Sequence, residues 1–195
     1  MYSTYVFIDG GYVREVVGRL GLPLPNPRAL GSTVTVGGGK IRDNGGYTWT
    51  SDFFMKRTIY YDASPDDGTP ASPNLEKYWN AIELLPDTQL GFGTLRGRKK
   101  SLRQKGVDTL MTVQMLSGVF NNVFEAVALV SGDADFVPVL QEVRRSGIQV
   151  VLAAEESSLS SELRREADRF VPLGVGKDDE RFSPMKIDGK EITEW

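Results

Sequence analysis

The chain has 195 residues, of which 40% are hydrophobic and 25% charged, a composition typical of one soluble globular domain. It contains no cysteine and no histidine. These two absences exclude thiolate nucleophiles, Ser-His and Cys-His pairs, disulfides and the soft ligands that usually hold zinc. Catalysis must therefore use carboxylates, Lys, Ser, Tyr or a hard cation such as Mg²⁺, Mn²⁺ or Ca²⁺.

The formal net charge of −3 is distributed unevenly. Residues 96–105 carry six basic and no acidic side chains, so the rest of the chain carries −9. A local basic patch is what phosphate binding needs, although such a run can also be a solvated loop. The residues that we expect to contact substrate are Arg98, Lys99, Lys100, Arg103 and Lys105.

Nothing in the sequence resembles a membrane segment. The longest apolar stretches, Val127 to Val130 and Val150 to Ala154, are far shorter than the ~20 residues needed to cross a bilayer. The N-terminus enters an apolar run without the basic and long apolar regions of a signal peptide. We therefore expect a cytoplasmic protein with no membrane partner. The oligomeric state is open, a homo-oligomer included.

Apolar runs and helical periodicities alternate along most of the chain. The predicted strands are residues 4–8, 53–61, 89–95, 126–131, 148–153 and 170–173. The predicted helices are residues 12–20, 73–85, 107–120, 134–146 and 159–168. This alternation predicts βαβ crossovers, and hence an α/β fold with a mainly parallel central sheet and helices on both faces.

Two segments depart from this pattern. Residues 22–52 hold three prolines and two glycine-rich runs, which predicts an insertion or substrate-side flap with hairpin arms at 33–36 and 47–50. The tail from Gly174 is polar, with a small hairpin suggested at Asp188-Gly189, and we expect it to pack weakly or not at all. The predicted organisation is one domain over residues 1–175, followed by a polar tail over 176–195.

Two of the predicted strands end in acidic residues. Asp9 follows the strand at 4–8, and Asp133 follows the strand at 126–131, with Asp135 two residues further. Ligands of parallel sheets bind beyond the carboxyl ends of the strands, so these acids should share one edge. Asp108, at the start of a predicted helix, can join them. Converging carboxylates need a divalent ion, so we predict a Mg²⁺ or Mn²⁺ site that activates water.

These acids also have ordinary structural explanations. Asp133 could cap the helix after it, Asp135 could complement the helix dipole, and Asp108 could be a simple helix-start residue. This explanation suits Asp9 less well, because it ends an apolar strand where an unpaired carboxylate would be costly. Ser131 is typical of a turn, with a position around the metal as the lesser alternative.

Three segments resemble the motif blocks of NYN domains, which are relatives of the PIN-domain nucleases. They are Phe-Ile-Asp-Gly at 7–10, Lys-Gly-Val-Asp at 105–108 and Ser-Gly-Asp-Ala-Asp-Phe at 131–136. The resemblance covers about residues 4–172, with 22–52 unmatched. It implies a three-layer PIN-like fold and ribonuclease activity on RNA. It also implies a Mg²⁺ or Mn²⁺ site at Asp9, Asp108, Asp133 and Asp135.

The chain departs from the family pattern at two positions. Gly11 stands where relatives commonly carry Asn, and Gln114 stands where they often carry an acid. Gln114 can coordinate a metal through its carbonyl oxygen but brings no charge. The alternative to a ribonuclease is therefore an RNA-binding or partner-docking module that has lost turnover.

Residues 133–137 also fit the Asp-x-Asp-x-(Thr/Val) pattern of haloacid-dehalogenase-like phosphatases, in which Asp133 would accept a phosphoryl group. That hypothesis ranks third, because the chain after Asp133 is short for that fold and Asp9 and Asp108 are left without roles.

Overall fold

The computed structural model describes the whole chain except residues 37–39, 44–45, 50–51, 66–70, 97–102, 175–181 and 194–195. A seven-stranded sheet in the order β6-β5-β4-β1-β7-β8-β9 forms its centre. Neighbouring strands are parallel, except that β6 runs antiparallel to β5 at the edge. The strands are β1 (Tyr2–Asp9), β4 (Phe53–Pro65), β5 (Thr88–Arg96), β6 (Arg103–Lys105), β7 (Ala126–Val130), β8 (Gln149–Ala154) and β9 (Arg169–Pro172).

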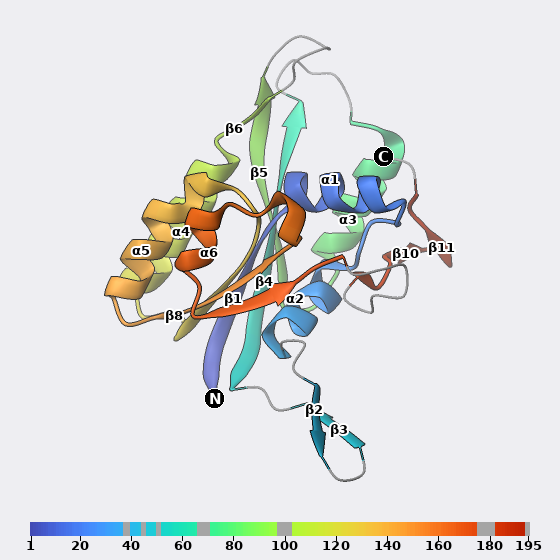
Figure 1. Cartoon of the computed structure of the whole chain (residues 1–195). Coiled ribbons are helices and arrows are strands. Elements are labelled where there is room, and N and C mark those ends of the chain that lie inside the picture. Colours follow the sequence, from blue (N-terminus) through green and yellow to red (C-terminus); the bar gives the residue numbers. More distant parts are fainter. Residues whose placement is uncertain are drawn as a thin grey trace.

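Helices cover both faces of this sheet (Figure 1). One face carries α1 (Gly10–Leu20), α2 (Pro27–Val36) and α3 (Pro73–Glu83). The other carries α4 (Val107–Phe120), α5 (Val137–Arg145) and α6 (Ser161–Arg165). The expected three-layer α/β fold is therefore confirmed. No helix of the described residues is long and apolar enough to cross a membrane.

The central strands are buried on both faces, as their continuous apolar runs predict. All five residues of β7 are buried. Ala128 and Val130 face the α1–α3 side, whereas Val127 and Leu129 face the α4–α6 side. A hydrophobic core therefore lies on each face of the sheet. Packing on both faces fixes the backbone at the ends of the strands.

Two of the expected helices are shorter than predicted. The helix expected at 134–146 divides into a 3₁₀ turn, η1 (Ala134–Phe136), and α5. The helix expected at 159–168 is reduced to α6, preceded by the 3₁₀ turn η2 (Glu156–Ser158). In α5 the residue without an N–H, Pro138, occupies the first turn, where no intrahelical N–H bond is needed.

The expected hairpin arm at 33–36 is wrong, because these residues are the last turn of α2. Asn26 Oδ1 accepts the N–H groups of Arg28 and Ala29, which starts the helix, and Leu30 and Val34 are fully buried. The β-branched residues favour a strand locally, but burial of one helical face outweighs that preference. The hairpin is instead formed by β2 (Lys40–Asp43) and β3 (Gly46–Trp49), which extend away from the sheet (Figure 1).

The expectation that the C-terminal tail packs weakly is also wrong for its described part. Phe182, Met185 and Ile192 are buried in the core on the α1–α3 side. The N–H of Leu24 donates to the carbonyl of Ile192 at 2.9 Å, which ties the tail to the segment before α2. The small hairpin at Asp188-Gly189 is present as β10 (Lys186–Ile187) and β11 (Lys190–Glu191).

The place of α2 in the core can be tested by truncating one side chain. Leu30→Ala should lower the free energy of unfolding by about 2–5 kcal/mol, because it removes a fully buried side chain. Leu84→Ala is the matched control and should change it by less than about 0.5 kcal/mol, because Leu84 is 86% exposed. Urea denaturation measures both values. A neutral Leu30→Ala would place residues 27–36 outside the core.

Candidate functional site

The candidate site lies where the strand order reverses. From β1 the chain passes to β4 and β5 on one side, and later returns to β7, β8 and β9 on the other. The carboxyl ends of β1 and β7 therefore lie at the topological switch point, the usual ligand site of an open α/β sheet. Ile8 pairs with Val130, so Asp9 and Ser131 are the next residues on adjacent strands.

A path of hydrogen bonds joins the acids at these strand ends. Ser131 Oγ donates to Asp9 Oδ2 at 3.2 Å, and the N–H of Asp133 donates to Ser131 Oγ at 3.2 Å. The N–H of Asp135 then donates to Asp133 Oδ1 at 3.0 Å. The structure thus brings together Asp9, Ser131, Asp133 and Asp135, which are up to 126 positions apart in the sequence.

Asp9 is buried at the centre of this arrangement, with 7% of its surface exposed. Its Oδ1 accepts the N–H of Tyr12 at 3.1 Å, so Asp9 also caps α1. Burial, followed by the nearby charge of Asp108, raises the pKa of Asp9 to about 6, against the opposing effect of its hydrogen bonds. Gly10 permits the close packing that follows, because a Cβ there would lie 2.6 Å from the Tyr60 ring.

Asp108 approaches the same edge from the first turn of α4. Gly106, which precedes this helix, has φ 84°, a conformation that glycine adopts without steric cost. Burial raises the pKa of Asp108, and the charges of Asp133 and Asp135 raise it further. The four carboxylates of Asp9, Asp108, Asp133 and Asp135 are therefore electrostatically coupled, and we call them the acidic cluster.

The chemistry of these residues fits a hard divalent cation, because every candidate ligand atom is an oxygen. In the described part of the chain, however, no group of three or more acidic side chains is arranged to hold a metal ion. Asp9 and Asp133 each use a carboxylate oxygen to cap a helical segment, which is the ordinary structural explanation of an acid at a helix start. A carboxylate oxygen has two lone pairs, so capping leaves capacity for a further ligand bond.

Gln114, on α4, has no described contact with the acidic cluster. Its Oε1 accepts the hydroxyl of Tyr61 at 2.6 Å. Tyr61 pairs with Asp9 in the sheet, and burial raises its pKa above the ordinary value, so the hydroxyl stays protonated and donates. Gln114 is therefore connected to the site through the strand that neighbours Asp9.

The basic stretch begins at the carboxyl end of β5 and returns in β6. The backbone of Arg103 pairs with that of Arg96, and Lys105 pairs with Thr94. Arg98, Lys99 and Lys100 lie outside the described residues. Contact between these basic side chains and substrate therefore stays a prediction.

A buried ion pair near the site was not predicted from the sequence. Asp62, which lies within β4, is fully buried and pairs with Arg14 of α1. Its Oδ2 also accepts Nε1 of Trp79 at 2.8 Å, and its Oδ1 accepts the N–H of Ala63 at 2.8 Å. Asp62 directly follows the strand predicted at 53–61, as Asp9 follows the strand predicted at 4–8, so the same reasoning could have selected it. Nothing in the sequence selects Arg14 and Trp79 as its partners.

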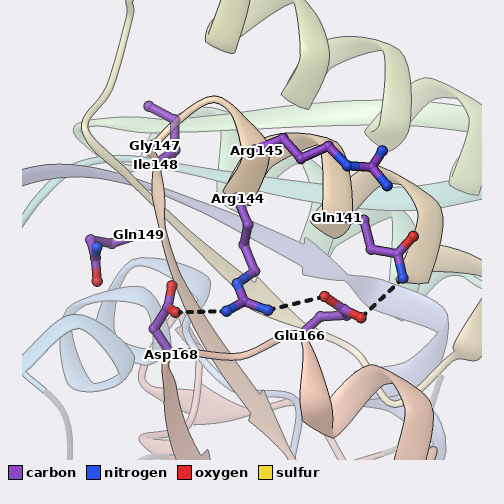
Figure 2. A pocket seen from close by; sticks show the side chains of 8 residues that line it. All are labelled: Gln141, Arg144, Arg145, Gly147, Ile148, Gln149, Glu166 and Asp168. Atoms are coloured by element: carbon purple, nitrogen blue, oxygen red, sulfur yellow. Dashed lines mark hydrogen bonds and ion pairs between the residues drawn. The ribbon is translucent and has the colours of Figure 1, made fainter.

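A hollow of about 500 Å³ lies at the opposite edge of the sheet. It is located at the amino ends of β8 and β9, where Arg144 bridges Glu166 and Asp168 (Figure 2). Its carboxylates are thus neutralised by an arginine. It is not the candidate site, because ligands of parallel sheets bind at the carboxyl ends of the strands.

A solved structure supports the fold, and one curated protein is similar over part of the chain. A solved structure of a Vibrio parahaemolyticus protein of unknown function superposes with a TM-score of 0.63 at 16% identity, covering 92% of this chain and 94% of that chain. An uncharacterized protein of Methanocaldococcus jannaschii is 29% identical over 79 residues, which are 40% of this chain. The match spans only 33% of the length of that relative.

A family match covers most of the chain and confirms the resemblance drawn from its motifs. Residues 3–174 match the NYN domain, which includes Asp9, Asp108, Asp133 and Asp135. The chain therefore belongs to the NYN domain family, a family of PIN-like nucleases.

Proposed function

We propose that this protein is a metal-dependent ribonuclease that hydrolyses RNA phosphodiester bonds at the acidic cluster. The observation that supports this most directly is the hydrogen-bonded path from Asp9 through Ser131 to Asp133 and Asp135 at the switch point. Family membership supports nuclease chemistry in general, and the absence of histidine and cysteine leaves oxygen ligands to perform it.

Asp9, Asp108, Asp133 and Asp135 would hold Mg²⁺ or Mn²⁺. When bound, such an ion lowers the pKa of a coordinated water and stabilises negative charge on the phosphate. The protein orients the ligands: the Tyr12 N–H and the Ser131 hydroxyl fix the Asp9 carboxylate from two directions. Asp108 enters from α4, so the ligands come from both sides of β1.

The electrostatics of the site favour cation binding. A buried carboxylate is costly to ionise, and the nearby charge of Asp108 adds to that cost, which is why the pKa of Asp9 is raised to about 6. A divalent ion among these groups would reverse that cost and favour the ionised forms. Binding free energy would then be largest at pH values where all four carboxylates have lost their protons.

An RNA-binding module without turnover is the second candidate. Gly11 and Gln114 favour it, since each lacks the polar or acidic group that relatives commonly carry, and Gln114 is already hydrogen-bonded to Tyr61. It predicts RNA binding that persists in EDTA together with no cleavage in Mg²⁺ or Mn²⁺. A phosphatase is not proposed, because the chain belongs to a different family.

Replacing any one of three acids of the cluster should be enough to abolish RNA cleavage. Asp9→Asn, Asp133→Asn and Asp135→Asn should each slow RNA cleavage by about 100-fold or more, because each removes a charge that would hold the activating ion. Asn still caps a helix, so none of the three variants should melt below the wild type in EDTA. Mn²⁺ should raise the melting temperature of the wild type only.

Asp188→Asn, in the exposed β10–β11 turn, is the matched control and should cleave normally. Wild-type turnover in all three site variants would rule out this cluster as the active site.

Asp9 should also make stability depend on pH. In the folded protein it holds its proton up to about pH 6, whereas in the unfolded chain it ionises near 3.8. The folded state binds more protons between these values, so the free energy of unfolding should fall as pH rises, by about 3 kcal/mol in total. Asp9→Asn should show a smaller fall in EDTA. Urea denaturation between pH 4 and about pH 8 compares them, and parallel profiles would contradict the raised pKa.

The basic stretch should bind phosphates of the substrate. Arg98→Ala with Lys99→Ala should flatten the log-log salt dependence of single-strand binding by roughly 0.7 for each phosphate that is no longer neutralised. Arg145→Ala with Lys186→Ala removes the same charge at exposed positions elsewhere and should leave the slope unchanged. Equal slopes for the two double variants would mean that the basic stretch does not contact RNA phosphates.

A further inference from the structure

We propose that Phe92 and Arg14 form a subsite for single-stranded RNA, in which a base stacks on Phe92 and a neighbouring phosphate binds Arg14. The subsite would lie beside the acidic cluster, on the α1–α3 side of the sheet edge. It rests on the proposed ribonuclease function and specifies how the substrate strand would be held.

Phe92 occupies the part of the sheet that projects beyond the acidic cluster. Asp9, the last residue of β1, pairs with Tyr61, but the pairing of β4 with β5 continues to Pro65 and Leu95 (Figure 1). Phe92 pairs with Asp62, one step past the level of Asp9. Adjacent strands are about 4.8 Å apart, which puts β5 roughly 10 Å from β1. An extended strand of RNA spans that separation with a nucleotide or two.

The Phe92 ring has a free face for a base. Phe92 is 43% exposed, although phenylalanine is usually buried and the strands of parallel sheets are covered on both faces. It meets Trp79 with ring centroids 4.9 Å apart and planes at 82°. An edge-to-face contact of this kind covers at most one face of the Phe92 ring. The exposed surface suits a nucleobase, since bases stack on aromatic side chains regardless of sequence.

Arg14 supplies a fixed cation next to this ring. Its guanidinium pairs with Asp62, and the Asp62 oxygen that it contacts also accepts the Trp79 indole N–H. The Arg14 side chain is 16% exposed, and its guanidinium has five N–H donors, of which the described hydrogen bonds use one. The remaining donors suit a phosphate, which arginine binds through a planar fork.

The same contacts fix how the two groups are arranged. Phe92 touches Trp79, Trp79 donates to Asp62, and Asp62 pairs with Arg14, so the ring and the cation belong to one packed unit. The charge of Arg14 also reaches Asp9, which places the unit close to the acidic cluster. A base within a duplex is already stacked on both faces, so the subsite selects single strands.

The test measures binding rather than turnover, in the Asp133→Asn background with Mg²⁺ present. A short fluorescent single-stranded RNA is titrated against this parent, and then against the parent carrying Phe92→Leu or Phe92→Tyr. Phe92→Leu keeps an apolar contact with Trp79 but removes the ring, and should weaken binding by at least about five-fold. Phe92→Tyr should bind like the parent. Phe120→Leu, at a 74% exposed position on α4, is the matched control and should have no effect.

An RNA of the same length with abasic residues isolates the stacking contribution. Phe92→Leu should not weaken binding of this probe, because the probe has no base to stack. Equal losses on the two probes, or no loss on either, would overturn the subsite. No binding of any probe by the parent would overturn it as well. Binding by the parent without cleavage by the wild-type protein would overturn only the ribonuclease proposal.

Arg14 is tested together with its partner, since removing one member of a buried ion pair leaves an uncompensated charge. Arg14→Gln with Asp62→Asn should flatten the salt dependence of RNA binding by roughly 0.7, because one phosphate is no longer neutralised. Phe92→Leu should leave this slope unchanged. An unchanged slope in the double variant, with its fold verified by circular dichroism, would remove Arg14 from the subsite.

Discussion

The hydrogen bond from Ser131 to Asp9 joins the ends of two adjacent buried strands, and the candidate site depends on it. It exists because β1 and β7 pair in parallel from Thr4 with Ala126 to Ile8 with Val130. Both strands are covered on both faces, so their ends cannot shift without disturbing the two cores. Asp133 and Asp135 follow from this one placement, because Ser131 and Asp133 each accept the N–H two residues further on.

The carboxylates of Asp9, at the end of β1, and Asp62, within β4, have opposite environments. Asp62 is fully buried, but it is paired with Arg14 and accepts two further N–H groups. Asp9 has no ion pair among the described contacts, and the charge of Asp108 raises its pKa more than the charge of Arg14 lowers it. A buried carboxylate that is paired with a cation is stabilised in its ionised form. A buried carboxylate near another acid is costly to ionise, and a bound cation would lower that cost. This contrast separates a residue that stabilises the fold from a residue suited to chemistry.

Family membership explains the framework, and the particular residues of this chain modify it. The family match ends at residue 174, yet Phe182, Met185 and Ile192 complete the core on the α1–α3 side. Gln114 is neutral and accepts a hydrogen bond from Tyr61, so it adds no charge to the acidic cluster. On the α1 side of the same edge, Arg14 adds a cation.

The sequence by itself determined the alternation of strands and helices, the exclusion of thiol and imidazole chemistry, and the acids at strand ends. Each of these is a local property, set by periodicity, residue type and chain order. Only the tertiary structure decided that residues 33–36 are helical, that the C-terminal segment packs, that β1 adjoins β7, and that Asp62 pairs with Arg14. These outcomes depend on contacts between distant segments. Burial and charge pairing between such segments outweigh the local preference of each residue for helix or strand. A short stretch of sequence does not contain both of the segments that make the contact.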